Sequence, residues 1–189
     1  MGNDAVDQAR AAAVMMQISD QEFAALRSLI YSRFGINLTE EKRSLLVGRL
    51  QKLLRSQNLA SFQDYYDYLA KDTSGRAVSD LVNLISTNYT YFNREKDHFD
   101  YFLKTALPQV CNRLRQRGQK DVRVWCAGCS SGEEAYTLLM LMHEYLGAEY
   151  RQWSAGLLAT DISERVLATA RQGIYAADKV ASLPEALQR

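Results

Sequence analysis

The stretch from Val122 to Asp161 decides the fold of this 189-residue chain. It opens VRVWCAGCSSGEEAYTLLMLMHEYLG, from Val122 to Gly147, and closes GLLATD, from Gly156 to Asp161. The short apolar runs at its two ends are typical of buried parallel strands, and the longer segment between them is typical of a helix. The order strand, glycine-bearing turn, helix, strand predicts the first half of a nucleotide-binding α/β sheet.

Helical patterns flank this stretch on both sides. Ser19 to Glu22 reads S-D-Q-E, a capping box that begins a helix, and Gly35 is a typical helix end. Thr39 and Ser61 are expected N-caps of the next two helices. We expect helices at about 19–34, 39–56, 61–71, 76–86, 95–117 and 163–173, with Pro108 kinking or dividing the fifth. A proline-at-first-turn pattern at 182–185 predicts one more helix start.

The polar break Asp72-Thr73-Ser74-Gly75 is the best domain boundary. The expected organisation is a tail at 1–17, poorly ordered or loosely helical, and a small all-helical domain at 18–75. A linker helix and loop at 76–90 then lead to a Rossmann-like α/β domain at 91–189. The fold class is therefore α/β, preceded by a helical module.

The composition is that of an ordinary globular chain, with 47% hydrophobic and 24% charged residues and a net charge of +1. This near-neutral balance gives no general case for binding nucleic acid or membranes. The three cysteines are too few for a disulfide framework and indicate a reducing compartment. The apolar run Ala11 to Met16 is too short for a signal sequence or membrane span, so a cytoplasmic protein is expected.

The turn between the first strand and its helix predicts a ligand site, although a purely structural turn is an equal alternative. Gly128 and Gly132 allow a ligand to approach the backbone, but their G-x-x-x-G spacing differs from the dinucleotide G-x-G-x-x-G. The helix then begins with Glu133 and Glu134, and two carboxylates oppose a pyrophosphate. They suit a ligand end that carries positive charge, such as an amino group or a sulfonium.

Asp161 follows the second strand, where an acid can accept hydrogen bonds from the ribose hydroxyls of an adenosine. N-capping of the next helix is the alternative role, but Ser163 can also serve that purpose. The turn and the acid together favour an adenosine ligand without phosphates. Cys126 and Cys129 form a C-x-x-C pair without a second ligand pair, so we expect packing and no metal site.

From Lys42 to Arg55, the helix after Thr39 carries five positive charges with no acid among them. A solvated face is the simplest interpretation of such a run, and docking of an acidic partner helix is the alternative. The charged residues are Lys42, Arg43, Arg49, Lys52 and Arg55.

Three segments resemble the chemotaxis receptor methyltransferases of the CheR family. They are TNYTYFNRE (87–95), VRVWCAGCSSGEEAY (122–136) and LLATDISERVLATARQGIY (157–175). In order, they match the patterns T-N-x-T-x-F-F-R-E, R-V-W-x-A-x-x-S-x-G-E-E-x-Y and A-T/S-D-I-x-x-x-V-L-x-x-A-R-x-G-x-Y of that family. The segment KRSLLVGRLQKLLRSQNL (42–59) is similar to its N-terminal domain. Asn93 departs from the pattern, which has phenylalanine at that place.

The resemblance implies transfer of a methyl group from S-adenosylmethionine to glutamate side chains of bacterial chemoreceptors, with S-adenosylhomocysteine as product. It implies that Asn88, Thr90 and Arg94 contact the cofactor and line the transfer site, with Arg94 the candidate catalytic residue. It also implies that Glu134 holds the methionine end and Asp161 the ribose. Docking on the acidic receptor helices is implied for a basic set of residues, Arg49, Lys52 and Arg55.

Members of that family are longer than this chain. The resemblance therefore implies an α/β domain truncated after its second strand and helix, inactive alone and able to self-associate through an open sheet edge. An inert docking module that only binds S-adenosylmethionine or S-adenosylhomocysteine is the alternative function. A nicotinamide oxidoreductase is a third hypothesis, disfavoured by the glycine spacing and the acidic helix start.

Overall fold

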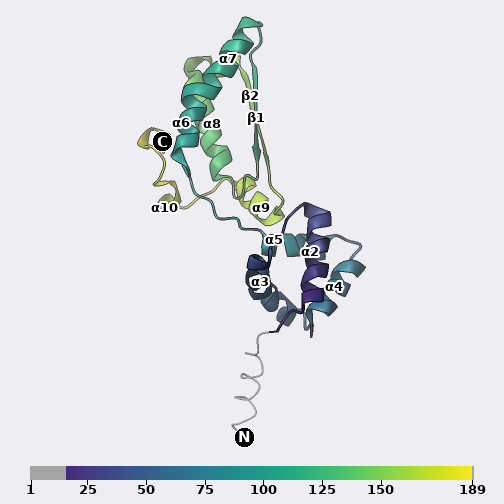
Figure 1. The fold of residues 1–189 in the computed structure, drawn as a ribbon. Helices are drawn as coiled ribbons and strands as arrows, with labels where there is room; N and C mark the ends of the chain where they lie inside the picture. The colour runs from purple at the N-terminus through teal and green to yellow at the C-terminus, as the bar shows by residue number, and fades with distance from the viewer. Residues whose placement is uncertain (1–15, 189) are drawn as a thin grey trace. The chain divides into compact units, whose positions relative to one another are not determined.

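The computed structural model describes residues 16–188, and Figure 1 shows its ribbon. The chain divides into two compact units, the first ending at Ile85 and the second beginning at Ser86. From the sequence we expected the domain boundary at Gly75, followed by a linker helix and loop at 76–90. In the structure that helix belongs to the first unit, because Ala77 and Leu81 are part of its core. Most of the expected tail lies outside the described residues.

The first unit is helical. It contains α2 (Asp20–Phe34), the 3-10 turn η1 (Glu40–Lys42), α3 (Arg43–Ser56), α4 (Phe62–Lys71) and α5 (Arg76–Ile85). One side of each α-helix is apolar and faces a single core, which removes those side chains from water. The largest fully buried members of this core are Phe23, Leu26, Ile30, Leu46, Leu50, Leu54, Phe62, Tyr65 and Leu81.

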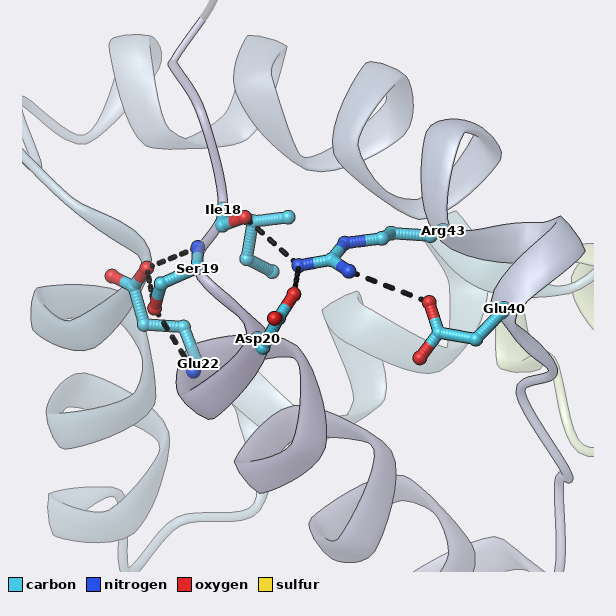
Figure 2. A network of polar contacts seen from close by, with 6 residues as sticks. All are labelled: Ile18, Ser19, Asp20, Glu22, Glu40 and Arg43. Atoms are coloured by element: carbon cyan, nitrogen blue, oxygen red, sulfur yellow. Dashed lines mark hydrogen bonds and ion pairs between the residues drawn. The ribbon is translucent and has the colours of Figure 1, made fainter.

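Polar side chains join the helix ends of this unit, as Figure 2 shows. The predicted capping box is present, because the Ser19 hydroxyl accepts from the Glu22 amide at 3.2 Å and the Glu22 carboxylate accepts from the Ser19 amide at 2.8 Å. Arg43, at the start of α3, donates to Asp20 at 2.7 Å, to the Ile18 carbonyl at 3.0 Å and to Glu40 at 3.4 Å. One guanidinium therefore links the first turns of α2 and α3 (Figure 2).

The starts of the next two helices differ in kind. Thr39 was expected to cap a helix, but it precedes the 3-10 turn η1 and makes no side-chain cap. Its hydroxyl donates instead to Glu41 at 3.2 Å, which leaves the first turn to close by the tighter 3-10 pattern. Ser61 does cap α4, since its hydroxyl accepts from the Asp64 amide at 3.1 Å.

The second unit begins with one long helical rod and continues as the expected α/β pattern. The rod is α6 (Lys96–Tyr101), the π-helical turn η2 (Phe102–Ala106) and α7 (Leu107–Gln116). Pro108 is in the first turn of α7, where it has no amide hydrogen to give to the preceding turn. The predicted division at Pro108 therefore takes the form of a π turn, with the Leu107 amide bonded to the Phe102 carbonyl.

The rest of the unit holds two parallel strands, β1 (Asp121–Ala127) and β2 (Ser154–Thr160). Helix α8 (Glu133–Leu146) and the 3-10 segment η3 (Gly147–Gln152) connect them. After β2 come α9 (Glu164–Gln172), a short helix α10 (Ala177–Val180) that the sequence did not predict, and the 3-10 turn η4 (Glu185–Leu187). The helix start expected at 182–185 yields only that last turn.

Helices cover one face of the β1–β2 pair within residues 16–188. Figure 1 shows α7 and α8 running beside the strands, and Val122 of β1 is buried with Cys111 of α7 and Met142 of α8. The other face carries Trp125 and Leu158, which are register partners and are 67% and 61% exposed. The expectation of a strand buried on both faces is therefore wrong for β1, whose burial alternates as on a half-covered sheet. In the described part of the chain, no helix is both long and apolar enough to cross a membrane.

Candidate functional site

The turn between β1 and α8 is fixed to the end of β2. The amides of Gly128 and Cys129 both donate to the Thr160 carbonyl, each at 2.8 Å. Gly128 and Gly132 have φ values of 84° and 102°, a left-handed backbone that glycine adopts without a steric penalty. The two glycines thus let the chain reverse at the carboxyl ends of the strands, where open α/β sheets bind their ligands.

Ser130 is the residue that connects the predicted site, and sequence reasoning did not single it out. Its amide donates to Asp161 Oδ2 at 2.8 Å and its hydroxyl donates to the Asn88 carbonyl at 3.0 Å. It is buried and has a φ of 49°, an uncommon conformation for a residue with a side chain. The serine in the S-x-G-E-E pattern was the only signal for it in the sequence.

Asp161 is held between two backbone amides. Its Oδ1 accepts from the Ser163 amide at 2.9 Å, while its Oδ2 accepts from Ser130. The Ser163 hydroxyl caps α9 by accepting from the Val166 amide at 3.5 Å, so capping does not require Asp161. Each carboxylate oxygen has a further lone pair, so Asp161 can still accept hydroxyl groups of a ligand.

The paired acids at the start of α8 have different environments. Glu133 is 1% exposed; its Oε2 accepts from the Ser131 hydroxyl at 2.6 Å, and its Oε1 has no hydrogen-bond partner among the described residues. Glu134 is exposed and accepts from the Cys126 thiol at 3.2 Å. The sequence treated both carboxylates as available to a cationic ligand. In the structure only Glu134 is accessible, because successive helical residues point in different directions.

Cys126 and Cys129 are close to both Glu134 and Asp161. Burial, and then the hydrogen bond to Glu134, raise the pKa of the Cys126 thiol to about 12, and the Asp161 charge acts in the same direction. Burial also raises the pKa of Cys129. Both thiols are therefore protonated at neutral pH and poor nucleophiles. In residues 16–188, no three metal-binding side chains come together.

In the segment at 87–95, the predicted residue with a hydrogen bond to the turn is Asn88. Asn88 is held there through Ser130, and its side-chain Nδ2 is buried without a hydrogen-bond partner among the described residues. Thr90 is half-buried, and Arg94 is exposed and donates to the Tyr89 carbonyl at 2.9 Å within its own loop. Asn93 has a φ of 59°, a conformation that asparagine adopts more readily than phenylalanine.

A cavity of about 430 Å³ lies beside Asp161, between α8, β2 and α9. Its wall is mainly apolar, and its size falls within the range of small-molecule sites. Gly132, Thr160 and Arg171 contribute to the lining, together with apolar side chains such as Leu139 and Leu157.

The basic residues of α3 belong to the helical unit and divide in two groups. Arg49 is half-buried and donates to the carbonyls of Leu84 at 3.3 Å and Ile85 at 2.6 Å, the last residues of α5. This contact satisfies helix-end carbonyls that would otherwise be bare. Lys52 and Arg55 are exposed on the outer side of α3.

The residues at the strand ends fit an adenosine ligand that carries a cation. Glu134 supplies an accessible negative charge, Asp161 supplies acceptors for hydroxyl groups, and the unsatisfied Asn88 amide supplies a donor for a ligand oxygen. The amides at 128–130 are not available to a pyrophosphate, because they bond to Thr160 or Asp161.

Two family models match this chain, one over each unit. The model of the CheR methyltransferase all-alpha domain matches residues 21–86, and that of the CheR methyltransferase SAM binding domain matches residues 88–189. A chemotaxis protein methyltransferase of Borreliella burgdorferi is 39% identical over 173 residues, which cover 92% of this chain and 61% of that protein. That of Escherichia coli K12 is 35% identical over 175 residues, covering 92% of this chain and 57% of the relative. The chain thus spans about three fifths of the length of these curated relatives.

Proposed function

We propose that this chain, which belongs to the CheR methyltransferase family, supplies the docking module and the first part of the cofactor site of an enzyme that methylates chemoreceptor glutamates. The observation that carries the proposal is the placement of Glu134, Asp161 and Asn88 around one turn, with Ser130 and Cys126 linking them. In this proposal Asp161 accepts the ribose hydroxyls, and Glu134 pairs with the ammonium group of the methionine end.

S-adenosylmethionine, when bound, supplies a methyl group already activated by its sulfonium. The acceptor glutamate has an ordinary pKa of ~4.3 and is a carboxylate at neutral pH, so no general base is needed. The work left to the chain is alignment of the two reactants and neutralisation of the incoming carboxylate. Arg94 is exposed beside the Asn88 loop, and we assign it the second task.

The proposed partner is the acidic helical methylation region of a chemoreceptor. Lys52 and Arg55 present positive charge on the exposed side of α3, which complements such a surface. Arg49 has a structural contact with the end of α5 in addition to any role in docking. We place the protein in the cytoplasm, a reducing compartment in which its three free cysteines would stay reduced.

Calorimetric titration of S-adenosylhomocysteine into the chain tests the cofactor assignment. We expect saturable binding that Asp161→Asn weakens about 10-fold or more, since a hydrogen bond to a charged group contributes about 1.5–3 kcal/mol. Asp121→Asn is the matched control, because Asp121 lies at the opposite end of β1 and is exposed. Absence of saturable heat in the wild-type chain, or equal affinity of wild type and Asp161→Asn, would contradict the proposal.

Docking is tested separately with a receptor methylation-region peptide. Lys52→Glu together with Arg55→Glu should weaken binding of this acidic helix and reduce its dependence on salt. Arg27→Glu with Arg33→Glu on α2 is the control, because it makes the same change in net charge on another helix. Equal losses in the two double variants would show that only net charge matters and would remove the docking surface from the proposal.

A further inference from the structure

The segment that follows α9 returns to the glycine turn. We define the strap as residues 175–183, from Tyr175 through α10 to Leu183. The Tyr175 hydroxyl donates to the Ser131 carbonyl at 2.6 Å, across 44 positions of sequence. Leu183 at the other end of the strap is buried. The strap is therefore anchored at both ends in the α/β unit.

Two glycines make room for two tyrosines at this junction. A Cβ on Gly132 would lie 2.6 Å from the Tyr175 hydroxyl, and a Cβ on Gly173 would lie 2.7 Å from the Tyr136 hydroxyl. The Tyr136 hydroxyl donates to the Ala170 carbonyl at 2.9 Å. Each tyrosine thus covers a glycine on the partner segment, but only Tyr175 reaches the turn of the proposed site.

The strap also holds the loop that contains Asn88. The rings of Tyr175 and Phe92 meet edge to face with their centroids 4.9 Å apart, and Phe92 is 2% exposed. The Ser182 hydroxyl donates to the Phe92 carbonyl at 2.8 Å. Ser130 fixes the other end of the same loop at Asn88. The loop from Asn88 to Phe92 is consequently tied to the turn directly and to the strap at its far end.

A charge contact completes the attachment. The Lys179 ammonium lies 3.8 Å from Oε1 of Glu133, the oxygen that has no hydrogen-bond partner in the described chain. Within residues 16–188, Lys179 is the basic side chain that pairs with this buried carboxylate, and α10 places it there. Tyr175 and Lys179 therefore contact adjacent parts of the turn from the same strap.

We propose that Tyr175 is a positioning residue, and that the strap sets the distance between the Asn88 loop and the glycine turn for cofactor binding. Tyr175 acts through Ser131 and Phe92 and need not touch the cofactor itself. The link to cofactor affinity rests on the proposed function. The link to loop order does not, and the two can be tested apart.

Hydrogen exchange of the wild-type chain, Tyr175→Phe and Tyr136→Phe tests loop order without any cofactor. Both variants lose one hydroxyl and one hydrogen bond from the same aromatic cluster and retain their rings. We expect Tyr175→Phe to accelerate exchange about tenfold in segments 86–94 and 128–134, the effect of losing roughly one hydrogen bond. Tyr136→Phe should leave these segments unchanged and accelerate exchange near residue 170.

Titration of S-adenosylhomocysteine then tests positioning. Tyr175→Phe should raise the Kd about tenfold, whereas Tyr136→Phe should leave it within about twofold although its melting temperature falls by a similar amount. A merely structural role would weaken binding in both variants alike. Ser182→Ala, which keeps both tyrosines, should give a smaller rise in Kd and is the second variant if Tyr175→Phe does not fold.

The outcomes separate the two proposals. If the wild-type chain does not bind S-adenosylhomocysteine, the proposed function fails, and the strap is judged by hydrogen exchange alone. If the wild-type chain binds but Tyr175→Phe binds equally well, or if its loop exchange matches that of Tyr136→Phe, the strap does not position the site.

Discussion

The helical unit and the α/β unit use their polar side chains in different ways. In the helical unit polar contacts join helix ends to one another: Glu22 caps α2 and also accepts from the Gln63 amide of α4 at 3.0 Å. In the α/β unit they gather at the carboxyl ends of the two strands, around Ser130 and Asp161. The contacts of the helical unit stabilise its fold, whereas those of the α/β unit position polar groups at the candidate ligand site.

The apolar cores differ in the same sense. The helical unit buries one large cluster, while the α/β unit has two smaller clusters and an exposed sheet face with Trp125 and Leu158. Each unit also leaves two buried polar side-chain atoms without a hydrogen-bond partner in the described chain. Only those of the α/β unit, on Asn88 and Glu133, lie at the candidate site. A buried polar group without a hydrogen-bond partner costs free energy of folding. The position of these two groups beside the turn therefore favours a ligand site there.

The largest expected effect is a cavity in the helical core. Leu50→Ala should destabilise the helical unit by about 3 kcal/mol, because Leu50 is fully buried in its single cluster. Leu45→Ala is the control on the same helix, since Leu45 is 45% exposed. Native-state hydrogen exchange should show lost protection in 20–85 and unchanged protection in 121–172. Equal losses in both segments would show that the two units do not unfold separately.

Steric exclusion at the turn should be the next largest effect. Gly132→Ala adds a Cβ 2.6 Å from the Tyr175 hydroxyl at a φ of 102°, so both overpacking and backbone strain apply. We expect a loss of about 2–3 kcal/mol in the α/β unit. Gly118→Ala has a φ of 66° with open space around it, and should cost only about 1 kcal/mol. Denaturant titration of the two variants measures the difference, and equal losses would remove the Tyr175 contact as its cause.

Loss of a helix cap should have a moderate effect in the helical unit. Ser61→Ala removes the acceptor for the Asp64 amide and should cost about 1 kcal/mol. Ser56→Ala is the matched control at the C-terminal end of α3, where the hydroxyl only donates to the Leu53 carbonyl. Thermal unfolding followed by circular dichroism should show a lower melting temperature for Ser61→Ala than for Ser56→Ala. The reverse order would mean that the cap does not stabilise α4.

The smallest expected effect is a pH dependence of the helical unit. Burial opposes ionisation of Glu22, but hydrogen bonds from Ser19 and Gln63 outweigh it and hold its pKa below the ordinary 4.5. A depressed folded-state pKa means that this stabilisation is complete above pH 4.5 and is lost as the pH falls through the folded pKa. Glu22→Gln should flatten that part of the stability profile. An unchanged acid slope in Glu22→Gln would assign the slope to other carboxylates.

The fold class and the family resemblance predicted from the sequence are confirmed, and their success has a local cause. The Ser19–Glu22 capping box, the buried face of Phe23, Leu26 and Ile30, and the strand–turn–helix order around Gly132 all depend on residues close together in the chain. Such patterns can be recognised in the sequence because backbone preference and side-chain periodicity act over one or two helical turns. The assigned roles of Arg94, Glu134 and Asp161 stay predictions until binding is measured.

The sequence by itself determined the longer helices and the two strands, and therefore that two strand ends and a glycine turn meet. Only the tertiary structure separated Glu133 from Glu134, engaged Arg49 at the end of α5, and placed Ser130 and Tyr175 at the turn. The physical reason is distance along the chain: Ser130 meets Asn88 across 42 positions and Ser182 meets Phe92 across 90. A serine or tyrosine carries no sign of such a partner in its own neighbourhood, because packing of the whole unit decides which distant carbonyl it reaches.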